Sequence, residues 1–166
     1  MKVRKALFNE LPEILTIYET ARGFMKQTGN PTQWAGGYPS EELLRADIDG
    51  GFLYVVEDAG VLHGVFAFFP DGDPVYDTLP VAWRNDRPHA AIHRVASAGT
   101  RKGVLRTCVE YCLSVASNLK IDTHKDNTVM QSALKKLGFE DCGTAHIPDV
   151  GERIVYQRFE EERKLL

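Results

Sequence analysis

Apolar residues recur along this chain at two different spacings, and the spacing separates predicted strands from predicted helices. Short runs rich in β-branched and aromatic residues predict seven strands, at residues 3–8, 52–57, 61–69, 89–97, 119–123, 140–147 and 153–159. Stripes of apolar residues at helical spacing predict four helices, which carry Leu11 to Met25, Leu43 to Ile48, Val104 to Val115 and Asn127 to Leu137. The predicted order is strand, two helices, three strands, helix, strand, helix and two strands.

Capping and turn residues indicate where several of these elements begin and end. Asn9 and Ser40 are predicted N-caps of the first two helices, and a glycine pair ends the second one. The Asp-Ala-Gly sequence at residues 58–60 predicts a hairpin between two strands. Two long loops remain, at residues 28–39 and 70–88, and loops as long as the second are often functional.

Composition and charge exclude several classes of protein. The chain has 166 residues, of which 43% are hydrophobic, so we expect one domain, residues 1–166, whose core needs no disulfide or structural metal. Lys and Arg number 20 against 23 Asp and Glu, and the net charge of -3 argues against a nucleic acid or a membrane surface as partner. The three cysteines have no metal-binding spacing. Apolar runs too short to cross a bilayer and the lack of a secretion signal predict a cytoplasmic protein.

A basic segment before the third predicted helix is the strongest sign of a binding site in the residues themselves. Arg101, Lys102 and Arg106 flank Gly103. A glycine at a helix start lets an anion approach the unpaired amides there, so the segment predicts a phosphate or pyrophosphate site. A solvated helix start explains the same residues, and the segment alone does not decide between the two.

Three motifs together resemble the GNAT superfamily of acetyl-CoA-dependent N-acetyltransferases over nearly the full chain. They are LPEI at residues 11–14, the strand, loop and helix around Gly103, and the helix that runs from Asn127 to LGF at residues 137–139. The resemblance implies an α+β, three-layer fold with a mixed, mostly antiparallel sheet of about seven strands flanked by about four helices. It also implies direct transfer of an acetyl group from acetyl-CoA to a primary amine, without a metal.

The resemblance implies a donor site for acetyl-CoA. In this family the backbone of one strand pairs with the pantetheine arm, and the amides of the following loop and helix hold the pyrophosphate. The matching residues here are Val95, Ala96, Ser97, Arg101, Lys102, Gly103, Val104, Leu105, Arg106 and Asn127. The chain departs from the family pattern at Thr100 and Leu105. Helix capping alone also explains Asn127.

Three residues are candidates for the general base. Asp122 lies where some family members have a glutamate, five residues before Asn127. His93 and His124 are alternatives, because the attacking amine must be neutral and imidazole titrates nearer to neutral pH than a carboxylate does. Pairing of Asp122 with a lysine, or surface hydrogen bonds of the histidines, would explain each residue structurally. The tyrosine that family members often use as general acid is replaced by Leu134.

The predicted acceptor is an amine of a small molecule or peptide, and the two long loops hold the clues to it. Trp34, Tyr38 and Trp83 supply aromatic surface, and residues 70–88 carry four aspartates against two arginines. An acidic aromatic site favours a cation. The tryptophans are explained equally well as anchors of the loops. The sequence leaves a homodimer open.

The alternative function is a catalytically impaired GNAT-fold module that binds coenzyme A or regulates another protein. Leu134 at the usual tyrosine position favours this alternative. A doubly wound nucleotide-binding domain fits poorly, because the hairpin at residues 52–69 is antiparallel and the chain has no GxGxxG sequence.

Overall fold

The computed structural model of the chain describes residues 1–161, so residues 162–166 of the predicted domain lie outside it. One sheet contains β1 (Lys2–Lys5), β2 (Leu53–Asp58), β3 (Val61–Phe69), β4 (Ala90–Ser97), β5 (Asn118–Thr123), β6 (Glu140–Ile147) and β7 (Gly151–Phe159). The helices are α1 (Leu11–Gln27), α2 (Glu41–Asp49), the short α3 (Pro74–Asp77), α4 (Val104–Val115) and α5 (Thr128–Lys136). The predicted mixed, mostly antiparallel sheet of seven strands is confirmed.

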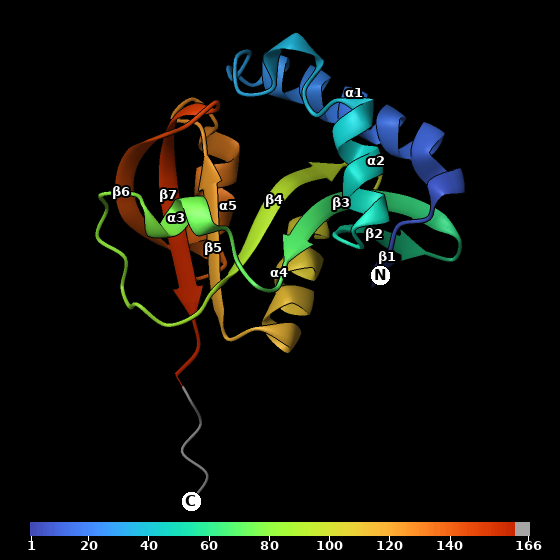
Figure 1. Cartoon of the computed structure of the whole chain (residues 1–166). Helices are drawn as coiled ribbons and strands as arrows, with labels where there is room; N and C mark the ends of the chain where they lie inside the picture. The colour runs from blue at the N-terminus through green and yellow to red at the C-terminus, as the bar shows by residue number, and fades with distance from the viewer. Residues whose placement is uncertain (162–166) are drawn as a thin grey trace, which may run out of the picture.

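The strand order is β1-β2-β3-β4-β5-β7-β6, and the β4–β5 pair is the parallel one. Helices cover both faces of this sheet (Figure 1), so its central strands are buried on both sides. In β2, Leu53 and Val55 pack in the cluster that contains α1 and α2, while Tyr54 and Val56 pack in the cluster that contains α4. A strand that is buried on both faces has a nearly continuous run of apolar residues in its sequence, and β2 and β3 both contain such a run.

The N-terminal region differs from its prediction. Residues Phe8–Glu10 form a 3-10 turn after a short first strand, and the predicted N-cap at Asn9 is wrong. Instead, the Glu10 carboxylate accepts a hydrogen bond from Leu7 N–H at 2.8 Å and forms an ion pair with Arg4. The hydrogen bond from Arg4 lowers the pKa of Glu10. These contacts hold the 3-10 turn, and α1 begins directly after it, at Leu11, with Pro12 in its first turn.

The second long loop contains an element that the sequence did not predict. Within residues 70–88, α3 forms one short helix, and Asp73 caps it by accepting from Val75 N–H at 3.0 Å. The cap predicted at Ser40 is confirmed, because its Oγ accepts from Leu43 N–H at 3.1 Å. The remaining order of strands and helices agrees with the prediction.

Strands β4 and β5 separate soon after they begin and open a wedge in the sheet (Figure 1). Within the described chain, β4 pairs with β5 at only two positions, Ala90 and Ala91. On its other side, β4 bulges against β3, and Arg94 in the bulge has a left-handed φ of 53°. Backbone groups of a strand alternate between its two edges. Part of the β4 backbone over residues 92–97 therefore faces the wedge instead of a partner strand.

Gly64 allows α4 to lie directly on β3, and Gly64→Ala is expected to destabilise the fold. An added Cβ would lie 2.3 Å from Val104 Cγ1 and 3.1 Å from Ala96 O. Overpacking of this kind costs about 1–3 kcal/mol in the free energy of unfolding, which urea unfolding measures. Gly23→Ala in α1 is the matched control, because its added Cβ meets no atom within 4 Å. Equal destabilisation by the two substitutions would contradict the prediction.

Candidate active site

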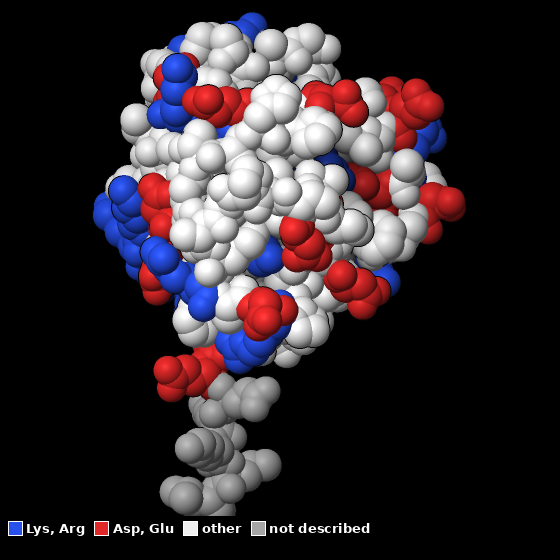
Figure 2. All heavy atoms as spheres, turned by 60° about the vertical axis from the view of Figure 1, so that its left-hand side comes forward, with Lys and Arg blue, Asp and Glu red and all other residues white. Residues whose placement is uncertain are grey.

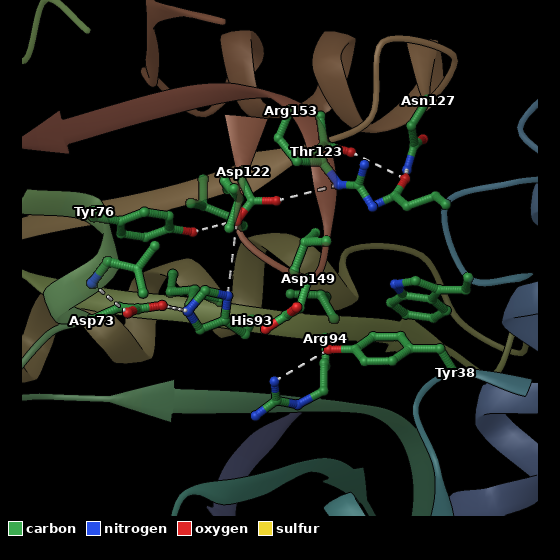
Figure 3. A pocket seen from close by; sticks show the side chains of 18 of the residues that line it. Tyr38, Asp73, Tyr76, His93, Arg94, Asp122, Thr123, Asn127, Asp149 and Arg153 are labelled. Carbon is green, nitrogen blue, oxygen red and sulfur yellow. Dashed lines mark hydrogen bonds and ion pairs between the residues drawn. The ribbon is translucent and has the colours of Figure 1, made fainter. Parts of the chain in front are cut away.

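A cavity of about 620 Å³ opens at the wedge between β4 and β5 (Figure 3). The two strands form one side of it, and α5, the two long loops and the β6–β7 turn form the others. The sequence-predicted site residues that line it are Trp34, Tyr38, His93, Val95, Asp122 and Asn127. Residues from distant parts of the chain thus meet at the place where the sheet is open.

His93 lies between two carboxylates on the wall of this cavity (Figure 3). Its Nε2 is 3.0 Å from Asp73 Oδ2, and its Nδ1 is 4.0 Å from Asp122 Oδ2. The Tyr76 hydroxyl donates to the same Asp122 oxygen at 2.6 Å, and Arg153 Nε lies 3.7 Å from Asp122 Oδ1. Asp122 therefore pairs with an arginine rather than with a lysine, and each nitrogen of His93 faces a carboxylate.

The contacts around His93 determine which groups carry charge. The hydrogen bond from His93 lowers the pKa of Asp73, against the effect of partial burial, and Val75 N–H also stabilises the carboxylate. Burial raises the pKa of Tyr76 far above that of a free phenol. Asp73 is therefore ionised at neutral pH and accepts a hydrogen bond from His93, while Tyr76 stays a hydrogen-bond donor to Asp122.

Gly72 and His89 together place Asp73 toward the cavity. Gly72 has a φ of 86°, and a Cβ there would lie only 2.6 Å from His89 O, so the loop approaches β4 more closely than a side chain would allow. Burial lowers the pKa of His89, and its Nε2 accepts a hydrogen bond from Asp73 N–H at 3.3 Å. A neutral, buried imidazole therefore holds the start of α3 behind the cavity.

Asp73→Asn is expected to reduce the loss of stability in acid. The pKa of Asp73 is lower in the folded chain than in the unfolded chain, where it is about 3.9. The carboxylate thus stabilises the fold above that value, and the contribution disappears as the pH falls through the folded value. Because the group is partly exposed, we expect less than about 1 kcal/mol.

Urea unfolding from about pH 7 to about pH 3 measures this effect as the change in unfolding free energy with pH. Asp71→Asn is the control, since Asp71 is an exposed carboxylate of the same loop that does not line the cavity. The prediction fails if Asp73→Asn leaves the pH dependence unchanged.

The start of α4 follows the C-terminal end of β4 and is a second candidate binding region, beside the wedge. Gly103 precedes α4 with a left-handed φ of 87°, and a Cβ there would meet only Met1 Cε within 4 Å, at 3.7 Å. The first amides of a helix have no partner within the helix. Val104 and Leu105 pack against the core, so their side chains point away and their backbone is what a ligand can reach.

The three basic side chains predicted for this region lie at the surface. Arg101 pairs with Asp58, and Arg106 lies 3.9 Å from Glu110 across one helical turn. Lys102 is exposed. Surface ion pairs contribute little free energy, so these pairs are easily exchanged for an anion.

The end of β4 offers backbone rather than side chains. Ala96 is buried in the core, and Ser97 Oγ accepts from Gly99 N–H at 3.1 Å. In the same loop, Thr100 Oγ1 lies 2.7 Å from Nδ1 of His63, which is buried in β3. These contacts fix the loop between β4 and α4, and they leave the β4 edge itself open to the wedge.

No sequence pattern points to Gln33, although it lies at the centre of a cluster of hydrogen bonds. Its Oε1 accepts from Asn30 Nδ2 at 2.8 Å, Asn127 Nδ2 at 3.0 Å and Thr123 Oγ1 at 3.4 Å. Asn127 also caps α5 as predicted, because its Oδ1 accepts from Met130 N–H at 3.1 Å. The cluster ties the loop after α1 to β5 and α5, across the cavity from β4.

Trp83, predicted to bind substrate, and His124, a predicted general base, do not line the cavity. Trp83 Nε1 donates to a carbonyl of α3 at 3.0 Å, and Lys120 Nζ lies 4.1 Å from the centre of the Trp83 ring. His124 lies beyond the end of β5, where its Nδ1 accepts from Asp126 N–H at 3.0 Å. Trp83 therefore anchors the second long loop, and His124 holds a turn. The structure does not group either of them with the cavity residues.

Two features are absent from residues 1–161, a metal-binding cluster and a membrane-spanning helix. Among these residues, no group of three or more His, Cys, Asp or Glu side chains is placed to hold a metal ion. In the same part of the chain, no helix is both long and apolar enough to span a membrane. On the face shown in Figure 2, acidic and basic side chains are interspersed, without one extended basic surface among the described residues.

Comparison with known proteins gives structural relatives only. No protein-family model and no curated protein sequence matches the chain. An acetyltransferase of the GNAT family from Streptococcus agalactiae is 28% identical, with a TM-score of 0.85 over 97% of this chain and 96% of that one.

More distant solved structures have the same fold. A GNAT-family acetyltransferase from Listeria monocytogenes is 18% identical, with a TM-score of 0.70 over 95% of this chain and 94% of that one. An acetyl transferase from Salmonella typhimurium that modifies the N-terminal serine of ribosomal protein L7/L12 is 14% identical, with a TM-score of 0.64 over 96% and 94%. By its fold and its likeness to the streptococcal enzyme over nearly its whole length, the chain belongs to the GNAT superfamily and is an acyltransferase.

Proposed function

We propose that the chain is a single-domain N-acetyltransferase that moves the acetyl group of acetyl-CoA to a primary amine of a small molecule or peptide. One observation carries the proposal: His93, held between two carboxylates, lies on the wall of the cavity at the open wedge of the sheet. An alkylamine arrives as an ammonium ion and must lose a proton before it can attack. His93 is the group placed to accept that proton.

The residues around the wedge fit acetyl-CoA as the donor substrate, which supplies an activated acetyl group. The open backbone edge of β4, from Val95 to Ser97, suits an extended arm that carries amides, as an added strand would. The amides that follow Gly103 suit a pyrophosphate at the start of α4. Positive charge near them comes from Arg101, Lys102 and Arg106.

We assign distinct roles to the groups around the reacting amine. His93 is the general base through Nδ1, because its Nε2–H donates to the ionised Asp73, which orients the ring. Asp122, held by the Tyr76 hydroxyl, faces Nδ1 at 4.0 Å and offsets the positive charge that forms when this nitrogen accepts the proton. Backbone N–H groups of β4 that face the wedge polarise the acetyl carbonyl, which is an effective way to stabilise developing negative charge.

No side chain is assigned as the general acid. Leu134, at the position where family members often have tyrosine, is fully buried in the core and carries no proton to donate. The thiol of coenzyme A is comparable in acidity to cysteine, with a pKa of about 8.5, so water suffices to protonate the departing thiolate.

Leu134 also favours a second candidate function, a GNAT-fold module that binds coenzyme A without turnover. Thiol release from acetyl-CoA in the presence of a panel of primary amines distinguishes the two. We expect amine-dependent release together with the N-acetylated product by mass spectrometry. Tight binding of coenzyme A by calorimetry without release on any amine would favour the module. Absence of both binding and release would overturn both candidates.

A further inference from the structure

The two arginines that line the cavity are already paired with carboxylates of the protein. Arg94 donates to the buried Asp47 through Nε at 2.9 Å and through Nη2 at 3.0 Å. Arg153 Nε lies 3.7 Å from Asp122 Oδ1, and its Nη1 donates to Glu152 O at 2.8 Å. Among the residues that line the cavity, these are the only side chains with a permanent positive charge. An anionic acceptor would therefore find no uncompensated guanidinium there.

Asp149, in contrast to the two arginines, is a charged residue of the lining that has no charged partner in the described part of the chain. It lies in the β6–β7 turn with a left-handed φ of 62°, is exposed, and lines the cavity. Figure 3 shows its carboxylate directed into this space. Asp73 and Asp122 are the other carboxylates of the lining, and each has partners, whereas no side chain within residues 1–161 forms an ion pair with Asp149. Of the three carboxylates, Asp149 is the one with no hydrogen-bonded or ion-paired side chain among residues 1–161.

An aromatic wall of fixed orientation also lines the cavity. The Tyr38 and Trp34 rings are 6.3 Å apart between centroids, and Trp34 packs against buried Tyr18 at 5.6 Å. Tyr38 is held at both ends, because Arg94 Nη1 donates to its hydroxyl at 3.4 Å and Arg22 Nη1 donates to its carbonyl at 3.1 Å. The faces of fixed aromatic rings attract cations. The Asp149 carboxylate and the aromatic rings of Trp34 and Tyr38 thus both favour a cationic ligand.

We propose that the acceptor is a primary amine that carries a second cationic group, as a linear diamine does, and that Asp149 binds this second group. The proposal rests on the proposed acetyl transfer. The reacting nitrogen must become neutral beside His93 before it attacks. Asp149 is therefore available to bind the second cationic group of the acceptor, which keeps its charge through the reaction. Three carboxylates and two arginines line the cavity, and Asp47 lies behind one of the arginines, so a dication enters a site of net negative charge.

Initial rates of thiol release test the proposal with three sets of acceptors of matched length. These are linear diamines, monoamines and ω-amino carboxylates. An exposed charge pair contributes up to about 1 kcal/mol, so the best diamine should exceed its monoamine about fivefold in kcat/KM. Asp149→Asn should abolish this ratio, and Asp149→Lys should make the amino carboxylate the better substrate. Added salt should reduce the advantage of the diamine in the unmodified enzyme.

Asp71→Lys is the matched control, because Asp71 is exposed in the second long loop but does not line the cavity. It should leave the order of the three acceptor sets unchanged. Equal kcat/KM for diamines and monoamines, or the same reversal by Asp71→Lys as by Asp149→Lys, would overturn the proposal while acetyl transfer itself stands. Absence of thiol release with every amine would instead overturn both the acetyl transfer and the choice of acceptor.

Discussion

Replacing His93 with glutamine is expected to lower kcat/KM for acetyl transfer about a hundred- to ten-thousandfold, the usual range for loss of a general base. Glutamine can still donate a hydrogen bond to Asp73, the partner that lies 3.0 Å from His93 Nε2, so the loop keeps its anchor. It cannot accept a proton from an ammonium ion. Affinity for coenzyme A, measured by calorimetry, should therefore remain close to that of the unmodified enzyme while turnover falls.

His124→Gln is the control for this experiment. It removes the other histidine that the sequence suggested as a base, from a turn that lies outside the cavity. We expect turnover within a few-fold of the unmodified enzyme. Comparable losses in the two variants would show that neither imidazole acts as the base. A large loss of turnover in His124→Gln alone would instead assign the general base to His124, beyond the end of β5.

Replacing Gly103 with valine is expected to weaken coenzyme A binding about ten- to a hundredfold. Valine does not readily adopt the left-handed backbone found there, with φ at 87°, so the loop before α4 must rearrange. A hydrogen bond to a charged group is worth about 1.5–3 kcal/mol, and misplacing one amide of the proposed pyrophosphate site accounts for the loss. Calorimetric titration with coenzyme A measures it.

Gly138→Val separates this effect from backbone strain alone. Gly138 also has a left-handed φ, 82°, and the nearest atom to an added Cβ is 3.7 Å away at both glycines. It lies at the far end of α5, away from the start of α4. Both variants should lose similar unfolding free energy, about 1–2 kcal/mol from the left-handed conformation. Unchanged affinity in Gly103→Val would remove the α4 start as the pyrophosphate site.

The order of strands and helices could be predicted because short-range signals mark it. A serine at position 40 caps one helix and an asparagine at 127 caps another, and both caps are present. The start of α1 was misplaced because residues Phe8–Glu10 form a 3-10 turn instead, which the Glu10 side chain caps by accepting from Leu7 N–H. Likewise α3 forms within a loop rich in proline and is capped by Asp73. It was not predicted because no stripe of apolar residues at helical spacing follows this cap.

The candidate site was only partly predictable, because side-chain direction depends on packing between distant segments. His93 and Asp122 are close, but the groups that complete their surroundings, Asp73 and Tyr76, come from a loop with no periodic pattern. Trp83 has the same residue type as Trp34, and only the fold shows that it packs under Lys120 instead of lining the cavity. A family resemblance supplies the position of a motif, whereas the partners of its side chains require the structure.

The open edge of β4 also bears on how this chain avoids aggregation. Unpaired strand edges are templates on which other chains can add, and they usually lie at the outer margins of a sheet, here at β1 and β6. The edge over residues 92–97 lies inside the sheet, between β5 and the loops that close the cavity. A single extended molecule can lie along this edge, whereas a strand that stays paired within another sheet would have to enter between β4 and β5. We therefore expect this edge to add a ligand more readily than another copy of the chain.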